Sequence, residues 1–460
     1  MIQTNPQFAP FAARMQAEGL PPIFIDTFAH YYEQLVTGHS GLIPEADIDP
    51  VSSTPDLQTF PDQLAHAGTV ALEQTVVIKL NGGLGTSMGL EKAKSLLPVK
   101  NDYTFLDIIS RQAVQAGVPL VLMNSFSTDE DSLAILEQYT ELRTDLPLSF
   151  VQHKEPKIDR SDFSPAEWPK EPALEWCPPG HGDLYTALIT QGTLAAMLQA
   201  GYKYAFVSNA DNLGATLDKI LVGYFANNGF PFMMEVADRT EMDKKGGHLA
   251  RRKADGQLVL RELAQCPEND MDAFQEIQRH KYFNTNNLWI NLDAMQKIMH
   301  QRNNRLGLPM ILNQKTVDPR DSESTPVFQL ETAMGSAIDI FNGSQAVRVP
   351  RTRFAPVKKT DDLLAVRSDA YVLSEDFEVA LNPERTLGNL VVELDPRHYK
   401  FVADLDARFP HGAPSLLHCE RFHVTGDFLF EEDVICRGSV EMRNDTNIQT
   451  VIPAGTVLEG

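Results

Sequence analysis

A glycine-rich turn followed by a lysine is the first pattern in this chain that could do chemistry. Residues 79–100 read KLNGGLGTSMGLEKAKSLLPVK, and the apolar run TVVIKL leads directly into Gly82 and Gly83. Glycines let several backbone N–H groups approach a phosphate closely, and Lys94 adds a positive charge for the phosphate oxygens. The pattern predicts a phosphate-binding turn, although a tight connection between a strand and a helix would look similar.

Two familiar nucleotide motifs do not fit this turn. A P-loop requires GxxxxGK[ST], and no lysine directly follows Gly89. A dinucleotide fingerprint requires GxGxxG, and Met88 occupies the position of the third glycine. Hydride transfer with NAD is therefore the weaker hypothesis for this chain.

A histidine between two glycines marks a second candidate site. The segment WCPPGHGDLYTAL, residues 176–188, holds Gly180 and His181 just before a helix that we expect to begin near Asp183. A helix start presents free N–H groups to an anion. We favour a contact from His181 to a phosphate or sugar over a role as an ordinary surface histidine.

An acid and two amides follow a third apolar run. YAFVSNADNLGAT, residues 204–216, carries Asn209, Asp211 and Asn212 where the run ends. Ligands of open α/β sheets bind beyond the carboxyl ends of the strands, and Mg²⁺ prefers one or two carboxylates together with phosphate oxygens. Asp211 is therefore the expected metal ligand, and the alternative is a simple Asx turn.

Further polar segments suit the hydroxyl groups of a sugar. RTEMDKKGGHLAR at Arg239, FNTNNLWI at Phe283 and FQLETAMGSAID at Phe328 are rich in amides and acids. Within them, the candidate sugar contacts are Asn284, Asn286, Asn287 and Glu331.

A basic segment stands out against the acidic composition of the chain. Residues 348–367 read RVPRTRFAPVKKTDDLLAVR and carry six basic residues against two aspartates, while the whole chain has a net charge of −22. A solvated loop and a shaped anion site are both compatible with this pattern.

Composition excludes several classes of protein. The net charge of −22 disfavours nucleic acid and anionic membrane surfaces as partners. No stretch approaches the roughly 18 apolar residues of a membrane helix, and the first residues lack the pattern of a signal peptide, so we expect a cytoplasmic protein. The four cysteines lie far apart, which favours free thiols, with Cys177 as a bystander.

Alternating strand and helix patterns predict an α/β fold with a parallel sheet covered on both faces. We expect an N-terminal helical cap and linker over 1–70, with a helix over 23–36. After about residue 380, short β-type stretches predict an all-β module. Strands are expected at 75–80, 118–125, 148–152, 204–211 and 231–237, and helices at 104–115, 129–142, 186–200 and 217–227.

Taken in order, the motifs resemble one known family. LNGGLGTSMG with Lys94, WCPPGHGDLY, SNADNLGA, FNTNNLW and RFAPVKKTDDLL are similar to the eukaryotic-type UTP–glucose-1-phosphate uridylyltransferases over residues 74–373. The resemblance implies a Rossmann-like mixed sheet of the glycosyltransferase-A type and a C-terminal left-handed β-helix. It gives domains over 1–70, 71–345 and 346–460, a magnesium cofactor, and synthesis of UDP-glucose and pyrophosphate from UTP and glucose 1-phosphate.

The resemblance also implies roles for individual residues. It assigns catalysis to Lys94 and Lys358 and the metal to Asp211. Because Lys359 is next to Lys358, the alignment of the second catalytic lysine is open by one residue. Nucleotide contacts fall to Leu80, Asn81, Gly82, Gly83, Gln152 and Gly180. Sugar-phosphate contacts fall to His181, Asn209, Asp211 and Asn286, to which the pattern of polar residues adds Glu331.

We expect direct in-line displacement at the α-phosphorus, because a sugar phosphate is already an anion and needs no general base. The obstacle is repulsion between two polyanions, which Lys94, Lys358 and Mg²⁺ would offset. A covalent intermediate on His181 is the mechanistic rival. Two other hypotheses remain. The substrate could be N-acetylglucosamine 1-phosphate or galactose 1-phosphate, or the chain could be a UDP-sugar sensor without activity. The sequence also leaves open whether the chain forms a homo-oligomer.

Overall fold

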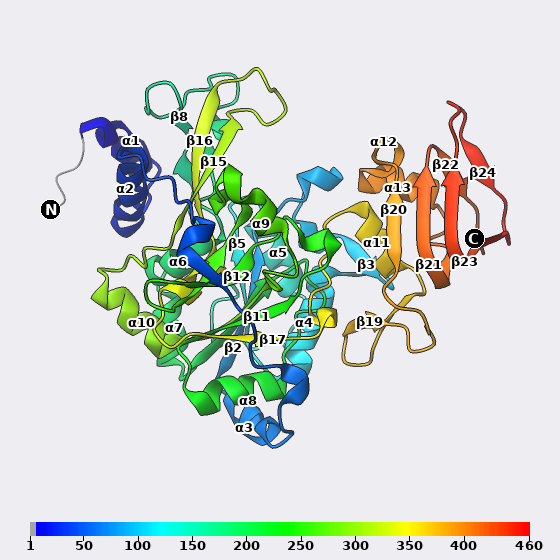
Figure 1. Cartoon of the computed structure of the whole chain (residues 1–460), viewed down its shortest axis with the longest axis horizontal. Helices are drawn as coiled ribbons and strands as arrows, with labels where there is room; N and C mark the ends of the chain where they lie inside the picture. The colour runs from blue at the N-terminus through cyan, green and yellow to red at the C-terminus, as the bar shows by residue number, and fades with distance from the viewer. Residues whose placement is uncertain (1–5) are drawn as a thin grey trace.

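The computed structural model describes residues 6–460 and arranges them in three regions along the longest axis (Figure 1). Two helices lie at one end, a ten-stranded sheet with its covering helices fills the middle, and a region of short parallel strands lies at the other end. None of the helices in residues 6–460 combines the length and the apolar character that a bilayer crossing requires.

The N-terminal region is an aromatic helix pair that packs on the middle region. Phe11 and Tyr32, from the two helices, are fully buried and their ring centroids lie 4.9 Å apart. Their cluster extends onto Ile158 and Met310. The helix expected over 23–36 is confirmed. The helices are α1 (Ala9–Ala17) and α2 (Pro22–Val36).

The main sheet is mixed, with a parallel half and a half that is antiparallel except for the β11–β17 pair. Strands β10, β2, β5 and β6 are neighbours and run parallel, whereas β14 runs antiparallel to β10 and β11. The prediction of a parallel sheet therefore holds for one half only. The strands of the sheet are β1 (Ile48–Pro50), β2 (Thr75–Asn81), β5 (Leu120–Asn124), β6 (Ser149–Val151), β10 (Tyr204–Asn209), β11 (Phe232–Asp238), β12 (His248–Arg252), β13 (Leu258–Arg261), β14 (Tyr282–Asn291) and β17 (Gln345–Arg348).

Helices cover both faces of this sheet because its central strands are apolar on both sides. In β2, Val76 and Ile78 face one helix layer, and Val77 faces the other. The helices of the first layer are α6 (Leu184–Thr190), α7 (Thr193–Gln199) and α10 (Leu292–Gln301). Those of the second layer are α4 (Phe105–Ala116), α5 (Asp129–Leu136) and α8 (Lys219–Asn228), with α3 (Leu64–Leu72) against α8.

Two expected helices differ from the structure. The helix predicted over 186–200 is two helices, because Gly192 adopts a left-handed φ of 73° between them. The helix predicted over 129–142 ends at Leu136. The expected linker is also held in place, since Ile48–Pro50 pairs with β12.

The C-terminal region contains the strands that the β-type stretches predicted, and most of them pair in parallel, but it is not all-β, because the helices over 396–399 and 402–408 lie within it. Its core continues into Met88, Leu97 and Val99, so it packs against the segment that follows the glycine turn. The proposed limit between residues 345 and 346 falls inside β17. The strands of the region are β18 (Tyr371–Leu373), β19 (Val379–Leu381), β20 (Val391–Leu394), β21 (Ser415–Thr425), β22 (Phe428–Phe430), β23 (Ile435–Arg443), β24 (Thr450–Ile452) and β25 (Val457–Glu459).

The remaining elements lie between these regions or within them, and α12 and α13 belong to the core of the C-terminal region. The helices are α9 (Met271–Gln275), α11 (Thr360–Arg367), α12 (Pro396–Tyr399) and α13 (Val402–Arg408). The strands are β3 (Pro98–Lys100), β4 (Tyr103–Thr104), β7 (Glu155–Pro156), β8 (Ile158–Asp159), β9 (Trp176–Cys177), β15 (Met310–Thr316) and β16 (Pro326–Thr332). All four cysteines are buried and free, as expected.

Candidate active site

The glycine turn and the end of β10 meet in an ion pair. Lys94 Nζ donates to Asp211 Oδ2 at 2.6 Å, although 117 residues separate the two. Their side chains are 15% and 24% exposed, so both remain accessible from solvent. The parallel pairing of β2 with β10 brings the two carboxyl ends together, and Leu80 is the register partner of Asn209. The residues predicted for phosphate and for metal therefore lie in one place.

The basic segment reaches the same place from the far side of the sequence. The N–H of Val357 donates to the carbonyl oxygen of Asp211 at 3.0 Å, which brings the backbone at Lys358 close to the residue that pairs with Lys94. Lys358 Nζ lies 5.7 Å from the centre of the Phe354 ring. Burial raises the pKa of Asp362, and Lys94 is among the cations that oppose the rise. Asp362 also accepts from the backbone N–H of Lys358, so this carboxylate lies near both the Lys94 side chain and the backbone at Lys358.

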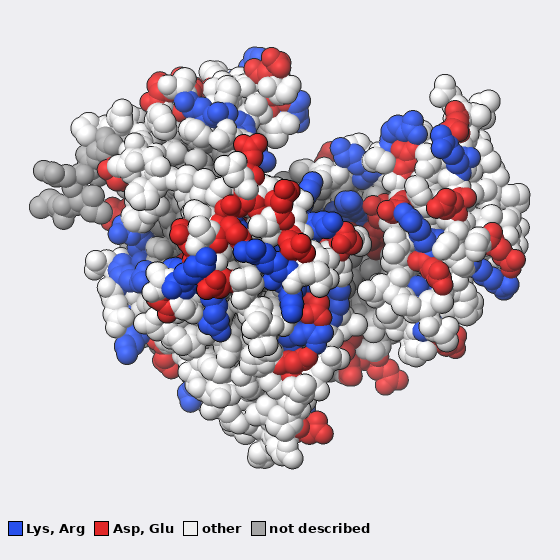
Figure 2. Space-filling model, in the orientation of Figure 1, with Lys and Arg blue, Asp and Glu red and all other residues white. Residues whose placement is uncertain are grey.

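The arginines of the basic segment are not free to form an anion site. Arg348 pairs with Asp56 and Asp238. Arg351, Arg353 and Arg367 pair with Asp243, Glu235 and Asp406. The segment is thus neither a solvated loop nor a cluster of unpaired cations. Figure 2 shows basic and acidic side chains interspersed over this face of the molecule.

The glycine turn leaves room for a close approach. A Cβ on Gly82 would lie 2.9 Å from Gln152 Nε2, so this glycine lets the Gln152 amide rest against the turn. Gly83 faces open space. Asn81, in contrast, is 3% exposed, and its amide donates to Asn124 and Ser132. The Asn81 side chain thus joins β2 to its neighbours and is not free to contact a nucleotide.

The second candidate turn has a neutral histidine. Gly180 adopts a φ of 76° and packs on the backbone of Thr332, where a Cβ would lie 2.6 Å from the carbonyl oxygen. His181 Nδ1 accepts from the Met334 N–H at 2.9 Å. Burial lowers the pKa of His181 to about 4. The ring is therefore neutral near pH 7, with its proton on Nε2. The helix expected near Asp183 begins at Leu184.

Asn286 lies in a bulge of β14. Three residues of β14, Thr285 to Asn287, oppose the single Glu235 of β11, and Asn286 adopts a left-handed φ of 60°. A bulge re-aims side chains in this way. Asn284 donates to the Asn286 side-chain oxygen at 2.7 Å.

Two amide side chains that we expected to face substrate are buried instead. Asn287 is fully buried and donates to Glu235. Asn212 is 3% exposed and donates to Asn287 and to the carbonyl oxygen of Arg353. Both side chains therefore have protein partners and point into the interior.

Glu331 adjoins the Gly180 turn rather than Asp211. Its Cβ lies 3.0 Å from the position that a Cβ on Gly180 would take. Burial raises the pKa of Glu331, and Asn313 opposes the rise. The pKa of Glu155 is raised by burial and by the neighbouring Glu331.

A carboxylate that the sequence analysis missed faces Lys358. Burial raises the pKa of Glu262 to about 7, and Lys358 opposes this rise. Glu262 follows β13 directly and packs against Gly247, whose missing side chain makes room for the carboxylate. The signal was available: the run LVLRE places an acid at the end of a strand.

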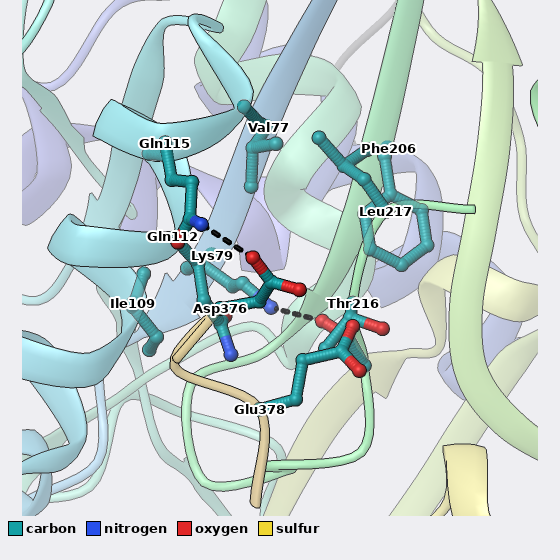
Figure 3. Close-up of a pocket in the computed structure, with 13 residues that line it drawn as sticks. Val77, Lys79, Ile109, Gln112, Gln115, Phe206, Thr216, Leu217, Asp376 and Glu378 are labelled. Carbon is teal, nitrogen blue, oxygen red and sulfur yellow. Dashed lines mark hydrogen bonds between the residues drawn. The ribbon is translucent and has the colours of Figure 1, made fainter. Parts of the chain in front are cut away.

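A cavity of about 190 Å³ lies apart from these residues, between α4, the 215–217 segment and the β18–β19 turn (Figure 3). Lys79 extends into its wall and donates to the carbonyl oxygen of Ala215 at 2.8 Å. Asp376 and Glu378 close it on the C-terminal side. Lys94, Asp211 and Lys358 do not line it.

The donors at the Asp211 site suit a metal that takes most of its ligands from substrate. Among residues 6–460, no group of three or more His, Cys, Asp or Glu side chains could hold a metal ion. A single partly exposed carboxylate beside a phosphate turn fits Mg²⁺, which keeps water and phosphate oxygens as ligands. It does not fit zinc, which needs three or four protein ligands.

Comparison with known proteins identifies the family of this chain. Residues 25–437 match the family model described as UTP–glucose-1-phosphate uridylyltransferase. Curated proteins of that name from Saccharomyces cerevisiae and Solanum tuberosum are each 40% identical over 395 residues. The alignments cover 84% of this chain and 77% and 80% of those proteins.

Solved structures agree over the whole chain. A mutant UDP-glucose pyrophosphorylase from Leishmania major in complex with UDP-glucose is 41% identical, with a TM-score of 0.91 and 99% of each chain covered. A structure from Trypanosoma brucei, described as a UDP-glucose phosphorylase, is 44% identical, with a TM-score of 0.88 over 99% of this chain and 98% of that one. The chain therefore belongs to the UTP–glucose-1-phosphate uridylyltransferase family.

Proposed function

We propose that this chain catalyses transfer of a uridylyl group from UTP to glucose 1-phosphate, forming UDP-glucose and releasing pyrophosphate. Membership of the family supports the overall reaction. The observation that carries the proposal is the Lys94–Asp211 ion pair at the glycine turn, with the backbone that carries Lys358 hydrogen-bonded to Asp211. Two lysines and one carboxylate on segments joined in this way are the groups that a triphosphate and its metal require.

The chemistry needs charge compensation more than it needs a base. An oxygen of the sugar phosphate forms a bond to the α-phosphorus of UTP, while the bond from that phosphorus to the bridging oxygen breaks and pyrophosphate leaves. Lys94 and Lys358 offset the repulsion between the two anions. Asp211 would hold Mg²⁺, which when bound neutralises charge on the phosphates and on the leaving group. Lys94 would exchange its contact with Asp211 for a phosphate oxygen.

His181 suits a role as a hydrogen-bond donor. Its Nδ1 lone pair is occupied by the Met334 N–H, and Nε2 carries the proton of the neutral ring. A covalent uridylyl intermediate on the imidazole would require an unprotonated nitrogen directed at the phosphorus. This geometry favours direct displacement, with Nε2–H donating to a phosphate or sugar oxygen.

Base and sugar would be held on opposite sides of the Lys94–Asp211 pair. Gln152, resting against Gly82 near the Gly180 turn, has an amide that can pair with the uracil edge. On the other side, Asn286 and Glu262 offer an amide and a carboxyl group to sugar hydroxyls. We further propose that the sheet is of the glycosyltransferase-A type and that the C-terminal parallel strands form a left-handed β-helix.

One assay tests the proposal. Pyrophosphate release from UTP is followed with glucose 1-phosphate, galactose 1-phosphate and N-acetylglucosamine 1-phosphate, each with and without Mg²⁺. We expect release with glucose 1-phosphate that depends on Mg²⁺. If pyrophosphate were released only with another sugar 1-phosphate, that compound would be the substrate. If UDP-glucose bound but no pyrophosphate were released, the result would favour a sensor.

A further inference from the structure

A buried ion pair lies beneath the proposed site, and the proposed chemistry does not use it. Arg353 Nε and Nη2 donate to the two carboxylate oxygens of Glu235 at 2.7 and 2.8 Å. The Glu235 side chain is fully buried and that of Arg353 is 8% exposed. Burial lowers the pKa of Arg353, but Glu235 and more distant carboxylates together raise it, so the net shift is upward and the guanidinium stays charged.

Two neutral donors complete the coordination of the carboxylate. Trp289 Nε1 donates to one oxygen of Glu235 at 2.9 Å, and Asn287 Nδ2 donates to the other at 3.1 Å. The bulge in β14 makes this possible, because it directs Asn287 inward while Asn286 turns outward. A buried carboxylate with four donors is held in one orientation.

The same network fastens the segment that carries Lys358. The Asn212 side chain donates to the carbonyl oxygen of Arg353 at 3.2 Å and accepts from the N–H of Ala355 at 2.9 Å. Arg353 Nη2 also donates to the carbonyl oxygen of Thr216 at 2.8 Å. Gly214 packs so closely on the carbonyl oxygen of Thr352 that a side chain there would collide with it.

These contacts join two loops that approach the site from different sides. One loop, residues 211–216, begins with Asp211, and the other, residues 352–357, ends just before Lys358. Asn212 and Pro356 form an isolated antiparallel bridge beside the Val357–Asp211 hydrogen bond. The position of Lys358 relative to Asp211 therefore depends on how firmly these two loops are joined.

We propose that Glu235, Arg353 and Asn212 are positioning residues that hold Lys358 against Asp211 for uridylyl transfer. The inference rests on the proposed function, because it assigns these residues to the geometry of that site. A buried ion pair is weak evidence for stability, since a well-packed apolar pair of similar size often stabilises a fold equally well. Its four donors do, however, define one geometry, which a small number of apolar contacts would not.

The test replaces the pair by side chains of similar volume, Glu235→Leu with Arg353→Met, in the wild type and in a Lys358→Ala background. In the wild type we expect kcat for pyrophosphate release to fall by about 100-fold, because a displacement near 1 Å costs that much. We expect KM for UTP to change by less than about threefold, because the glycine turn is untouched. In the Lys358→Ala background the same pair should lower kcat by less than about threefold, since the lysine that it positions is absent.

A second variant and a control keep the result clear. Arg353→Lys keeps the charge but loses the fork geometry, and it should lower kcat by about 10-fold with an unchanged melting temperature. Arg348→Met removes two ion pairs of the same segment, with Asp56 and Asp238, that lie outside the network, and it should change kcat by less than about twofold. The positioning role would be overturned if the double substitution lowered kcat equally in the wild type and in Lys358→Ala, or if it did not lower kcat in the wild type. If Lys358→Ala alone left kcat unchanged, the proposed chemistry would fail instead.

Discussion

Two groups of charged residues lie on either side of the 211–216 loop, and they differ in access to water. Lys94 and Asp211 form one partly exposed contact. Arg353 and Glu235 form a buried pair in which the carboxylate receives four hydrogen bonds. The first group can exchange its partner for a phosphate or a metal, and the second cannot. Similar side chains thus serve binding in one place and geometry in the other.

Lys94→Ala should have the largest effect on the exposed group. The loss of a preorganised cation at a charged transition state should lower kcat by about 100- to 1,000-fold. Steady-state pyrophosphate release measures it, and circular dichroism checks the fold. The matched control is Lys92→Ala, an exposed lysine with only a distant contact to Asp131, which should retain normal activity. A near-normal rate for Lys94→Ala would remove Lys94 from the site.

Asp211→Asn should act mainly through the metal. The amide keeps the shape of the side chain but lacks the charge, so we expect the Mg²⁺ concentration for half-maximal rate to rise by about 10- to 100-fold. A titration of rate against Mg²⁺ at saturating UTP measures the shift. An unchanged titration curve would mean that the metal binds elsewhere.

Gln152→Ala should have a smaller and more selective effect. The ratio of kcat/KM for UTP to that for CTP should fall by about 10-fold, because a hydrogen-bond pair to the base is lost. Competition between the two nucleotides in one reaction gives this ratio directly. If both rates fell by the same factor, Gln152 would support the turn without reading the base.

Lys79→Met should change how the stability of the fold depends on pH. Burial, aided by Arg353, lowers the pKa of Lys79 from its ordinary value of 10.5 to about 7. Between these two values the unfolded chain binds a proton that the folded chain lacks, so the free energy of unfolding rises with pH. The wild type should gain up to about 1.4 kcal/mol per pH unit relative to Lys79→Met between pH 7.5 and 9.5. Urea unfolding of both proteins at several pH values measures this difference. If the free energies of unfolding of the wild type and of Lys79→Met changed with pH in the same way, Lys79 would be charged in the folded state.

Much of the fold was predictable from local apolar runs. The expected strands at the positions of β2, β5 and β10 are confirmed, because strands buried on both faces leave a continuous apolar signature. The antiparallel strand β14 was missed: FNTNNLWIN carries polar residues at a bulge, and its partners β10 and β11 are remote in sequence. Gly192 could have signalled the break between α6 and α7.

The site was predictable only where a motif lies next to a strand end. Lys94 and Asp211 follow β2 and β10, so the rule for ligand sites in α/β sheets predicted both at one edge, and the structure pairs them there. Asn212 and Asn287 were misjudged because an amide that faces substrate and one that faces a buried carboxylate read alike in sequence. The Glu235–Arg353 pair joins residues 118 positions apart, and no local pattern indicates such a pairing.

The central claim is that Lys94 and Lys358 act on one triphosphate. Lysine acetylation followed by mass spectrometry, with and without saturating UTP, tests it directly in the intact chain. We predict that UTP slows the modification of Lys94 and Lys358 together and leaves Lys92 and Lys359 unchanged. Protection of only one of Lys94 and Lys358 would contradict the claim.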